Sequence, residues 1–328
     1  MKRRTLLRGS AAALSASLLP SLAPLRAFAQ AEPYPTKTLR IVVPFAAGTS
    51  PDVLARLFAD KLSQSWGQAV MIDNRPGAAG AIGAENAANS PADGHTFFYP
   101  VSSVMEINPH VYATLRYNPL TDFLPVIQTA IVPYVLCASP AAPFNTMAEM
   151  VEYARQNPGK VNYASYGVGS QTQVAIEIWC KELGIKLTHI PYVSNAIPDL
   201  MSGVVSLLLE PATTAIALVK ANKIKALGAT SEQRIANLPN VPTLSEYRRG
   251  LQTAAWHGLF VPKGTPPAVV AKANAEMARI LALPEVRARL TELGLFSAGG
   301  SAEDLKTRLA AGHASWGRAI KDLGIKLQ

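Results

Sequence analysis

Apolar residues occur along this chain in two alternating patterns. Short, largely β-branched runs such as 39–43 are typical of buried strands, and this first run stops at Pro44, which cannot donate to a sheet ladder. After such runs, apolar residues recur every three or four positions, as on a helix with one buried face. Strands that alternate with helices in this way predict α/β units with a largely parallel sheet, whose ligands bind beyond the carboxyl ends of the strands.

The same alternation predicts strands and helices along most of the chain and suggests a division into two lobes. After the strand at 39–43, further strands are expected at 69–73, 96–99, 132–136, 161–164, 187–190, 204–209, 224–229 and 256–262. One helix is expected to begin at Pro51, a second to end at Ala88, a third to span 147–156 and a fourth to follow Ser170. Three more helices are expected after Pro266, Pro284 and Ser301. The pattern restarts near residue 133 and again near 256. We therefore expect residues 30–132 plus 257–328 to form one lobe and 133–256 the other, with a hinge at the two crossings.

Two loops in this scheme resemble each other and predict an anion site. In the first, small residues lead to Ser50 as the expected helix cap, with Pro51 at the first helical position and Asp52 in the first turn. In the second, the run 165–172 again places glycines and a hydroxyl residue before a helix. Free amides and the positive end of a helix dipole favour an anion there. An ordinary strand-to-helix turn is the alternative for either loop alone, and Asp52 is expected to be structural.

The first 29 residues are expected to be an export signal rather than part of the fold. Lys2, Arg3 and Arg4 form a twin-arginine segment, the run 11–19 is a short apolar stretch, and 27–29 is a small-x-small cleavage site. No later run is long enough for a transmembrane helix. The sequence therefore predicts twin-arginine export to the periplasm of a bacterium.

The net charge limits the kinds of ligand that the sequence favours, and the surroundings of the two cysteines indicate their chemical state. Five of the 31 basic residues and none of the 22 acidic residues lie in the signal, which leaves 26 against 22 and a net charge of +4. This balance is too weak to indicate nucleic acid or a membrane surface, and suits a small anionic ligand. Cys137 and Cys180 lie in apolar runs, where buried free thiols are favoured over a disulfide.

Motifs for catalysis, metals and cofactors are missing from the sequence. It contains no G-x-S-x-G segment and no phosphate-binding loop, and the glycines 167 and 169 lack the third glycine of a dinucleotide motif. The five histidines are scattered without metal-ligand spacing. We therefore expect no metal, no cofactor and no enzyme, although Glu210, Asp52 or a histidine could act as acid or base in a periplasmic enzyme.

Ordered motifs along the mature chain resemble the Bug-type periplasmic solute-binding receptors of tripartite tricarboxylate transporters. The matching segments are 43–48 with Asp52 and 55–56, 74–80 with 82–83, 92–96, 108–109, 163–170, 190–192, 238–243, 256–262 and 264–266. The resemblance implies a type II periplasmic-binding-protein fold, in which two α/β lobes close over a small carboxylated molecule. It also implies that loops 45–49 and 167–172 hold a ligand carboxylate, largely through backbone and water.

The loop pattern and the family resemblance together predict which residues bind the ligand. They are Phe45, Ala46, Ala47, Gly48, Thr49, Ser102, Tyr166, Gly167, Gly169, Ser170, Gln171, Thr172, Tyr192 and Glu210, with Ser50 and Asp52 in structural roles. Some of these residues depart from the family pattern. Thr49 stands where a second glycine is usual, and the segment 192–199 differs from the family and is shorter. Glu210 lies near a position at which the family commonly has an acidic residue, Asp. These departures fall at the rim of the expected cleft.

The function expected from the resemblance is capture of an organic carboxylate and its delivery to inner-membrane permease subunits, by a receptor that acts as a monomer. A periplasmic sensor that presents the closed lobes to a receptor kinase is the alternative from another class. A permease or a kinase encoded nearby would discriminate between them.

Overall fold

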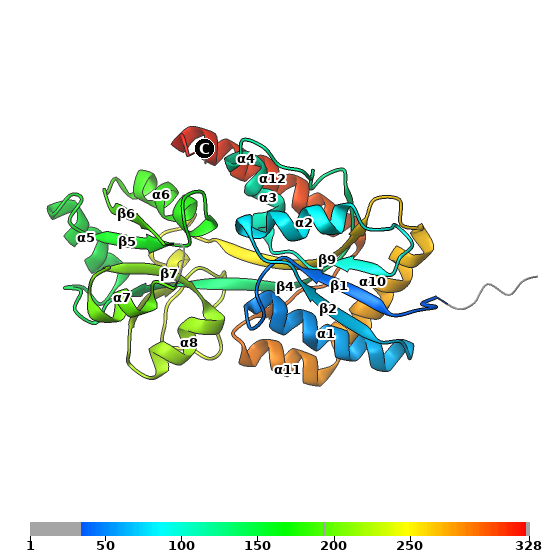
Figure 1. Cartoon of the computed structure of the whole chain (residues 1–328). Helices are drawn as coiled ribbons and strands as arrows, with labels where there is room; N and C mark the ends of the chain where they lie inside the picture. The colour runs from blue at the N-terminus through cyan, green and yellow to red at the C-terminus, as the bar shows by residue number, and fades with distance from the viewer. Residues whose placement is uncertain (1–33, 193–194, 326–328) are drawn as a thin grey trace, which may run out of the picture. The chain divides into compact units, whose positions relative to one another are not determined.

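Two sets of parallel strands form the sheet of this computed structural model, which describes residues 34–192 and 195–325 (Figure 1). In the first set, β1 (Leu39–Val43) lies between β2 (Val70–Asn74) and β3 (Thr96–Phe98). In the second, β5 (Asn162–Ser165) lies between β6 (Thr188–Pro191) and β7 (Leu207–Pro211). The expected parallel α/β units are thus present. The twin-arginine segment and the cleavage site lie outside the described residues.

Two long antiparallel strands join these sets. β4 (Phe123–Ala138) pairs with β9 (Ala254–Pro262) up to the pair Pro133 and Ala254. From Tyr134 onward, β4 pairs instead with β7 and with β8 (Lys225–Ala229), while the short β10 (Phe296–Ser297) pairs with β4 near Ile131. Figure 1 shows β4 and β9 side by side between the two sets of strands. The crossings expected near residues 133 and 256 therefore lie on neighbouring strands.

β4 is much longer than the strand expected at 132–136. It begins at Phe123, and the polar residues Gln128 and Thr129 within it are both buried. Pro125 and Pro133 also lie within it. Polar and proline positions obscure the apolar run from which a strand is recognised, although the side chains are buried by β9 and the helices around them.

Helices follow the strands in the expected order, and the missed ones are short. The helices are α1 (Ser50–Trp66), η1 (Ala78–Gly80), α2 (Ala81–Ala88), α3 (Ser102–Glu106), α4 (Asn108–Val111), α5 (Met147–Gln156), α6 (Gln171–Leu183), α7 (Ile197–Ser202), α8 (Ala212–Lys220), α9 (Leu244–Tyr247), α10 (Pro267–Ala282), α11 (Pro284–Glu292) and α12 (Ala302–Leu323). The unexpected α3, α4, α7, α8 and α9 have four to nine residues each. Segments of that length show little helical periodicity.

The C-terminal helix α12 packs its apolar stripe on both halves of the sheet. Leu305 and Leu309 join the cluster around Trp256 of β9, whereas Ile320 packs with Val174 of α6. Ser301 caps α12, as expected, by accepting a hydrogen bond from the amide of Asp304. Because this one helix contacts elements of both expected lobes, the lobe boundaries at 133 and 256 stay a prediction.

The two cysteines and the lengths of the helices can be compared with the sequence predictions. Cys137 and Cys180 are both buried and free, as the apolar runs around them indicated. Among the described residues, no helix has both the length and the apolar character needed to cross a bilayer.

Candidate ligand-binding site

A cavity of about 720 Å³ lies where the loops after β1, β3, β5 and β7 meet. Nine of the fourteen expected ligand-binding residues line it: Phe45, Gly48, Thr49, Tyr166, Gly169, Ser170, Gln171, Thr172 and Glu210. Apolar side chains from several elements complete the wall, among them Val53, Val101, Val111, Val132 and Leu293. The carboxyl ends of the parallel strands therefore converge on one cavity, as this class of sheet dictates.

Five expected ligand-binding residues lie outside the cavity wall. Ala46 and Ala47 are exposed on the loop, and Gly167 also does not line the wall. Ser102 is buried and bonds to protein groups instead. The Tyr192 hydroxyl donates to Asp199 at 2.5 Å. Both predicted loops line the cavity, but the sequence did not separate the wall residues from their neighbours.

The first loop owes its shape to a glycine and to a buried aspartate. Gly48 has a positive φ of 82°, which glycine adopts without a steric penalty. Its amide donates to Asp52 Oδ2 at 2.8 Å. Asp52 also accepts hydrogen bonds from Asn74 at 2.9 Å and from Arg56 at 3.0 Å. Asp52 thus connects the loop to the start of α1.

The cap expected at Ser50 is wrong. Thr49 has the extended backbone of the N-cap position, and Ser50 is the first residue of α1. Neither side chain caps the helix, and the Thr49 hydroxyl instead donates to the carbonyl oxygen of Ala46 at 2.6 Å. Ser50 Oγ is instead buried at the cavity wall with no hydrogen-bond partner among the described residues.

The second loop repeats this construction. Ser170 caps α6 by accepting a hydrogen bond from the amide of Gln173. The side chain of Gln173 in turn accepts from the amide of Gly169, at 2.7 Å, where φ is +77°. In both loops, therefore, a residue four positions along the chain occupies the glycine amide. The glycine amides themselves are not free to bind an anion.

Free amides remain in the first turns of the two helices. The first amides of an α-helix have no partner within the helix, which leaves those of Ser50 and Asp52 in α1 and of Gln171 and Thr172 in α6. Ser50, Gln171 and Thr172 line the cavity. Each helix adds the positive end of its dipole, so one cavity receives two converging partial positive charges.

A polar bridge joins the two halves of the site. The hydroxyl of Ser102, in α3, donates to Gln171 Oε1 at 3.3 Å and accepts from the backbone amide of Trp256. Gln171 Nε2 in turn donates to Thr253, just before β9, at 3.4 Å. Gln171 and Ser102 are almost fully buried. The start of α6 is thereby attached to α3 and to the crossing strand.

The cavity wall carries one acidic side chain and no lysine or arginine among the described residues. Glu210, at the end of β7, is 3% exposed and accepts a hydrogen bond from the Tyr166 hydroxyl at 2.5 Å. Burial raises the pKa of Glu210 to about 7, although hydrogen bonds from Tyr166 and Thr214 act in the opposite direction. Burial also lowers the pKa of His257, on the same wall, to about 3, so this imidazole is neutral.

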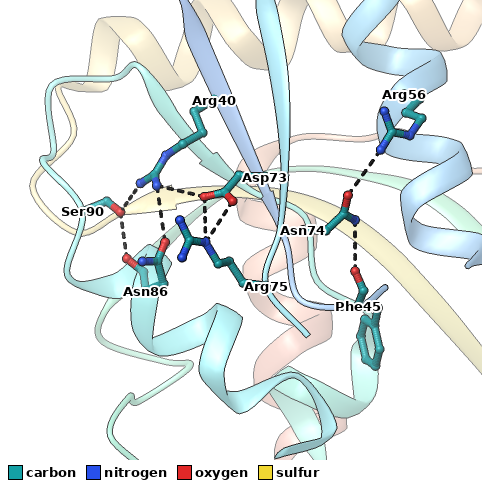
Figure 2. Close-up of polar contacts among 8 residues, drawn as sticks. All are labelled: Arg40, Phe45, Arg56, Asp73, Asn74, Arg75, Asn86 and Ser90. Carbon is teal, nitrogen blue, oxygen red and sulfur yellow. Dashed lines mark hydrogen bonds and ion pairs between the residues drawn. The ribbon is translucent and has the colours of Figure 1, made fainter. Parts of the chain in front are cut away.

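Arg75, a basic residue of the glycine-rich loop after β2, does not line the cavity. Figure 2 shows its guanidinium turned toward Asp73, at 2.9 Å, and this aspartate also contacts Arg40. Asn74, between these groups and the first loop, donates to the carbonyl oxygen of Phe45 at 3.0 Å. Arg75 is thus a half-exposed loop arginine in a surface network and not a charge partner for a ligand.

Sequence reasoning missed several wall residues because little marked them. Val132 and Tyr134 lie on the strand expected at 132–136, but nothing in the sequence marked them as ligand-binding, and Asn108 belongs to the unexpected α4. His257 lies in the matched segment 256–262, but the scattered spacing of the histidines gave no reason to assign it to the site. Thr213 and Thr214 belong to the unexpected α8. Their position after β7 could have been found from the rule that ligands bind at the carboxyl ends of strands.

Comparison with known proteins agrees with this geometry. Residues 54–325 match the family described as Tripartite tricarboxylate transporter family receptor. The chain is 35% identical to the structure of R. palustris Rpa4515 with adipate, which it matches with a TM-score of 0.82 over 89% of this chain and 99% of the other. It is 30% identical to periplasmic binding protein BugD, with a TM-score of 0.79 over 90% of this chain and all of BugD.

A third structure, MatC (Rpa3494) from Rhodopseudomonas palustris with bound malate, is 30% identical, with a TM-score of 0.77 over 88% of this chain and all of MatC. These matches confirm the α/β fold of the periplasmic binding proteins and the resemblance drawn from the motifs. Proteins of this family are binding receptors and not enzymes. This chain belongs to the receptor family of the tripartite tricarboxylate transporters.

Proposed function

We propose that this receptor binds a small organic carboxylate in the cavity and delivers it to the inner-membrane permease subunits of a tripartite transporter. The observation that carries the proposal is that the first turns of α1 and α6 line the same cavity. The similar proteins with adipate and with malate support it, since both ligands are carboxylates.

A carboxylate suits this cavity because the wall offers donors without a fixed cation. Its two oxygens would accept hydrogen bonds from the free amides of Ser50 in α1 and of Gln171 and Thr172 in α6. Hydrogen bonds to a charged group contribute about 1.5–3 kcal/mol each. The body of the solute would pack on apolar wall residues such as Val101 and Val111. The other expected residues, Ala46, Ala47, Ser102, Gly167 and Tyr192, would support these loops without touching the ligand.

Export and closure complete the proposed cycle. The twin-arginine segment would carry the chain to the periplasm, where it acts as a monomer. The lobe of residues 133–256 would close on that of 30–132 plus 257–328 by bending at the neighbouring strands β4 and β9. The hydrogen bond between Ser102 and Gln171, which joins the two lobes, would then mark the closed state.

Uptake by intact cells tests this function. The acid that co-purifies with the protein is identified by mass spectrometry and supplied in labelled form to cells that lack the receptor gene. We expect uptake to be lost in these cells, to be restored by the receptor gene, and to be lost equally when the permease genes are deleted. Uptake that persists without the receptor, together with loss of a transcriptional response to the acid, would favour the sensor and contradict the transport function.

A further inference from the structure

Glu210 and its neighbours form a part of the cavity wall that differs from the helix starts. The helix starts offer hydrogen-bond donors, whereas this part carries an acidic side chain. Glu210 closes β7, Tyr166 follows β5, and Thr214 lies on α8, and all three line the cavity. The Tyr166 hydroxyl donates to Glu210 Oε2 at 2.5 Å, so this hydroxyl is already used as a donor. What this part of the wall offers to a solute is therefore acceptor oxygen.

No protein cation balances Glu210. It forms no ion pair among the described residues, and no lysine or arginine lines the cavity there. The titratable groups that face it are Tyr166 on the loop after β5, and Tyr134 and Cys137 on β4, whose pKa values burial and the Glu210 charge raise together. All of these groups are uncharged near neutral pH, as is His257. A buried carboxylate without a cationic partner is costly and favours a ligand that supplies one.

We propose that Glu210 selects solutes that carry a hydrogen-bond donor, above all an amine, at the end remote from their carboxylate, and that it discriminates against dicarboxylates. This inference rests on the proposed function, because it takes the helix starts as the site of the first carboxylate. An ammonium group would pair with Glu210, whereas a second carboxylate would lie beside it in a space without cations. Adipate and malate, present in the similar structures, are dicarboxylates, and this chain would bind such solutes less tightly than matched amino acids.

Solutes matched in length test the selection directly. Calorimetric titrations at pH 7.5 would use 6-aminohexanoate, hexanoate and adipate, and, as a rigid set, 4-(aminomethyl)benzoate and terephthalate. We expect the amino acid of at least one set to bind at least tenfold more tightly than the matched diacid. In Glu210→Gln, which keeps the shape and removes the charge, this preference should fall at least tenfold.

The chain offers a matched control for this variant. Glu177 of α6 likewise accepts a hydrogen bond from a tyrosine, Tyr163, at 2.5 Å, but it does not line the cavity. Glu177→Gln should leave the preference unchanged. Tighter binding of the diacid by the wild type, or an unchanged preference in Glu210→Gln, would overturn the role of Glu210 and leave the carboxylate receptor intact. Failure of every acid in both sets to bind the wild type would count against the receptor function as well.

Discussion

Replacing Glu106 with glutamine is expected to raise the free energy of unfolding by about 3 kcal/mol at pH 8 and by less than about 1 kcal/mol at pH 5. Glu106, in α3, is 4% exposed and accepts a hydrogen bond from Trp256 Nε1 at 2.9 Å. Burial raises its pKa from 4.5 to about 7, although the bonds from Trp256 and Trp316 and the charge of Arg308 lower it.

The direction of the pH dependence follows from that shift. Between pH 4.5 and 7 the folded protein keeps a proton on Glu106 that the unfolded chain releases, so stability is lost as the pH rises through this range and is constant above it. Glutamine has no such penalty and still accepts from Trp256 through its carbonyl oxygen. The difference between variant and wild type also cancels the contribution of the other titrating groups, including His257.

Urea unfolding of both proteins at pH 5 and pH 8 measures this difference. Glu152→Gln, an exposed substitution on α5, is the control and should change the unfolding free energy by less than about 0.5 kcal/mol at either pH. A Glu106→Gln variant that is less stable than wild type at pH 8 would show that the carboxylate stabilises the fold.

Substituting Asp52 with alanine is expected to lower the free energy of unfolding by about 2–4 kcal/mol and to weaken solute binding at least tenfold. The side chain is only 3% exposed, and its oxygens accept from Gly48, Asn74 and Arg56. Its loss leaves the Gly48 amide and the Asn74 side chain without their partner. The loop that positions the start of α1 then loses its attachment to the helix.

Thermal and urea unfolding, with calorimetric titration of the folded variant, measure both effects. Asp60→Ala is the matched control, because Asp60 is an exposed aspartate on the same helix. It should leave stability within about 0.5 kcal/mol of wild type. An Asp52→Ala variant with wild-type stability and no binding would instead make Asp52 a direct contact of the solute.

The helices and strands were predicted well where the signal lies within a few neighbouring residues. The strand 39–43, the helix 147–156 and the Ser301 cap all follow from apolar periodicity and cap chemistry that act over a few residues. β4 could not be predicted in full, because its polar residues are buried only by partners far away in sequence. The short helices α3, α4 and α8 depend on packing for the same reason.

The site was predictable as two loops but not as a set of contacts. Glycines and a hydroxyl residue before each helix marked both loops, and both line the cavity. That Gly48 donates to Asp52 and Gly169 to Gln173 depends on side-chain rotamers that the spacing does not specify. The free donors are consequently one or two residues further along, in the first helical turns.

The most direct test of the account compares each acid that binds with its own carboxamide, which has the same shape and no charge. Both are titrated into the wild-type protein by calorimetry at pH 7.5. If the starts of α1 and α6 hold a carboxylate, at least two charge-assisted hydrogen bonds weaken in the amide, and the affinity should fall by about a hundredfold or more. Equal affinity for the acid and the amide would contradict the carboxylate site at the two helix starts.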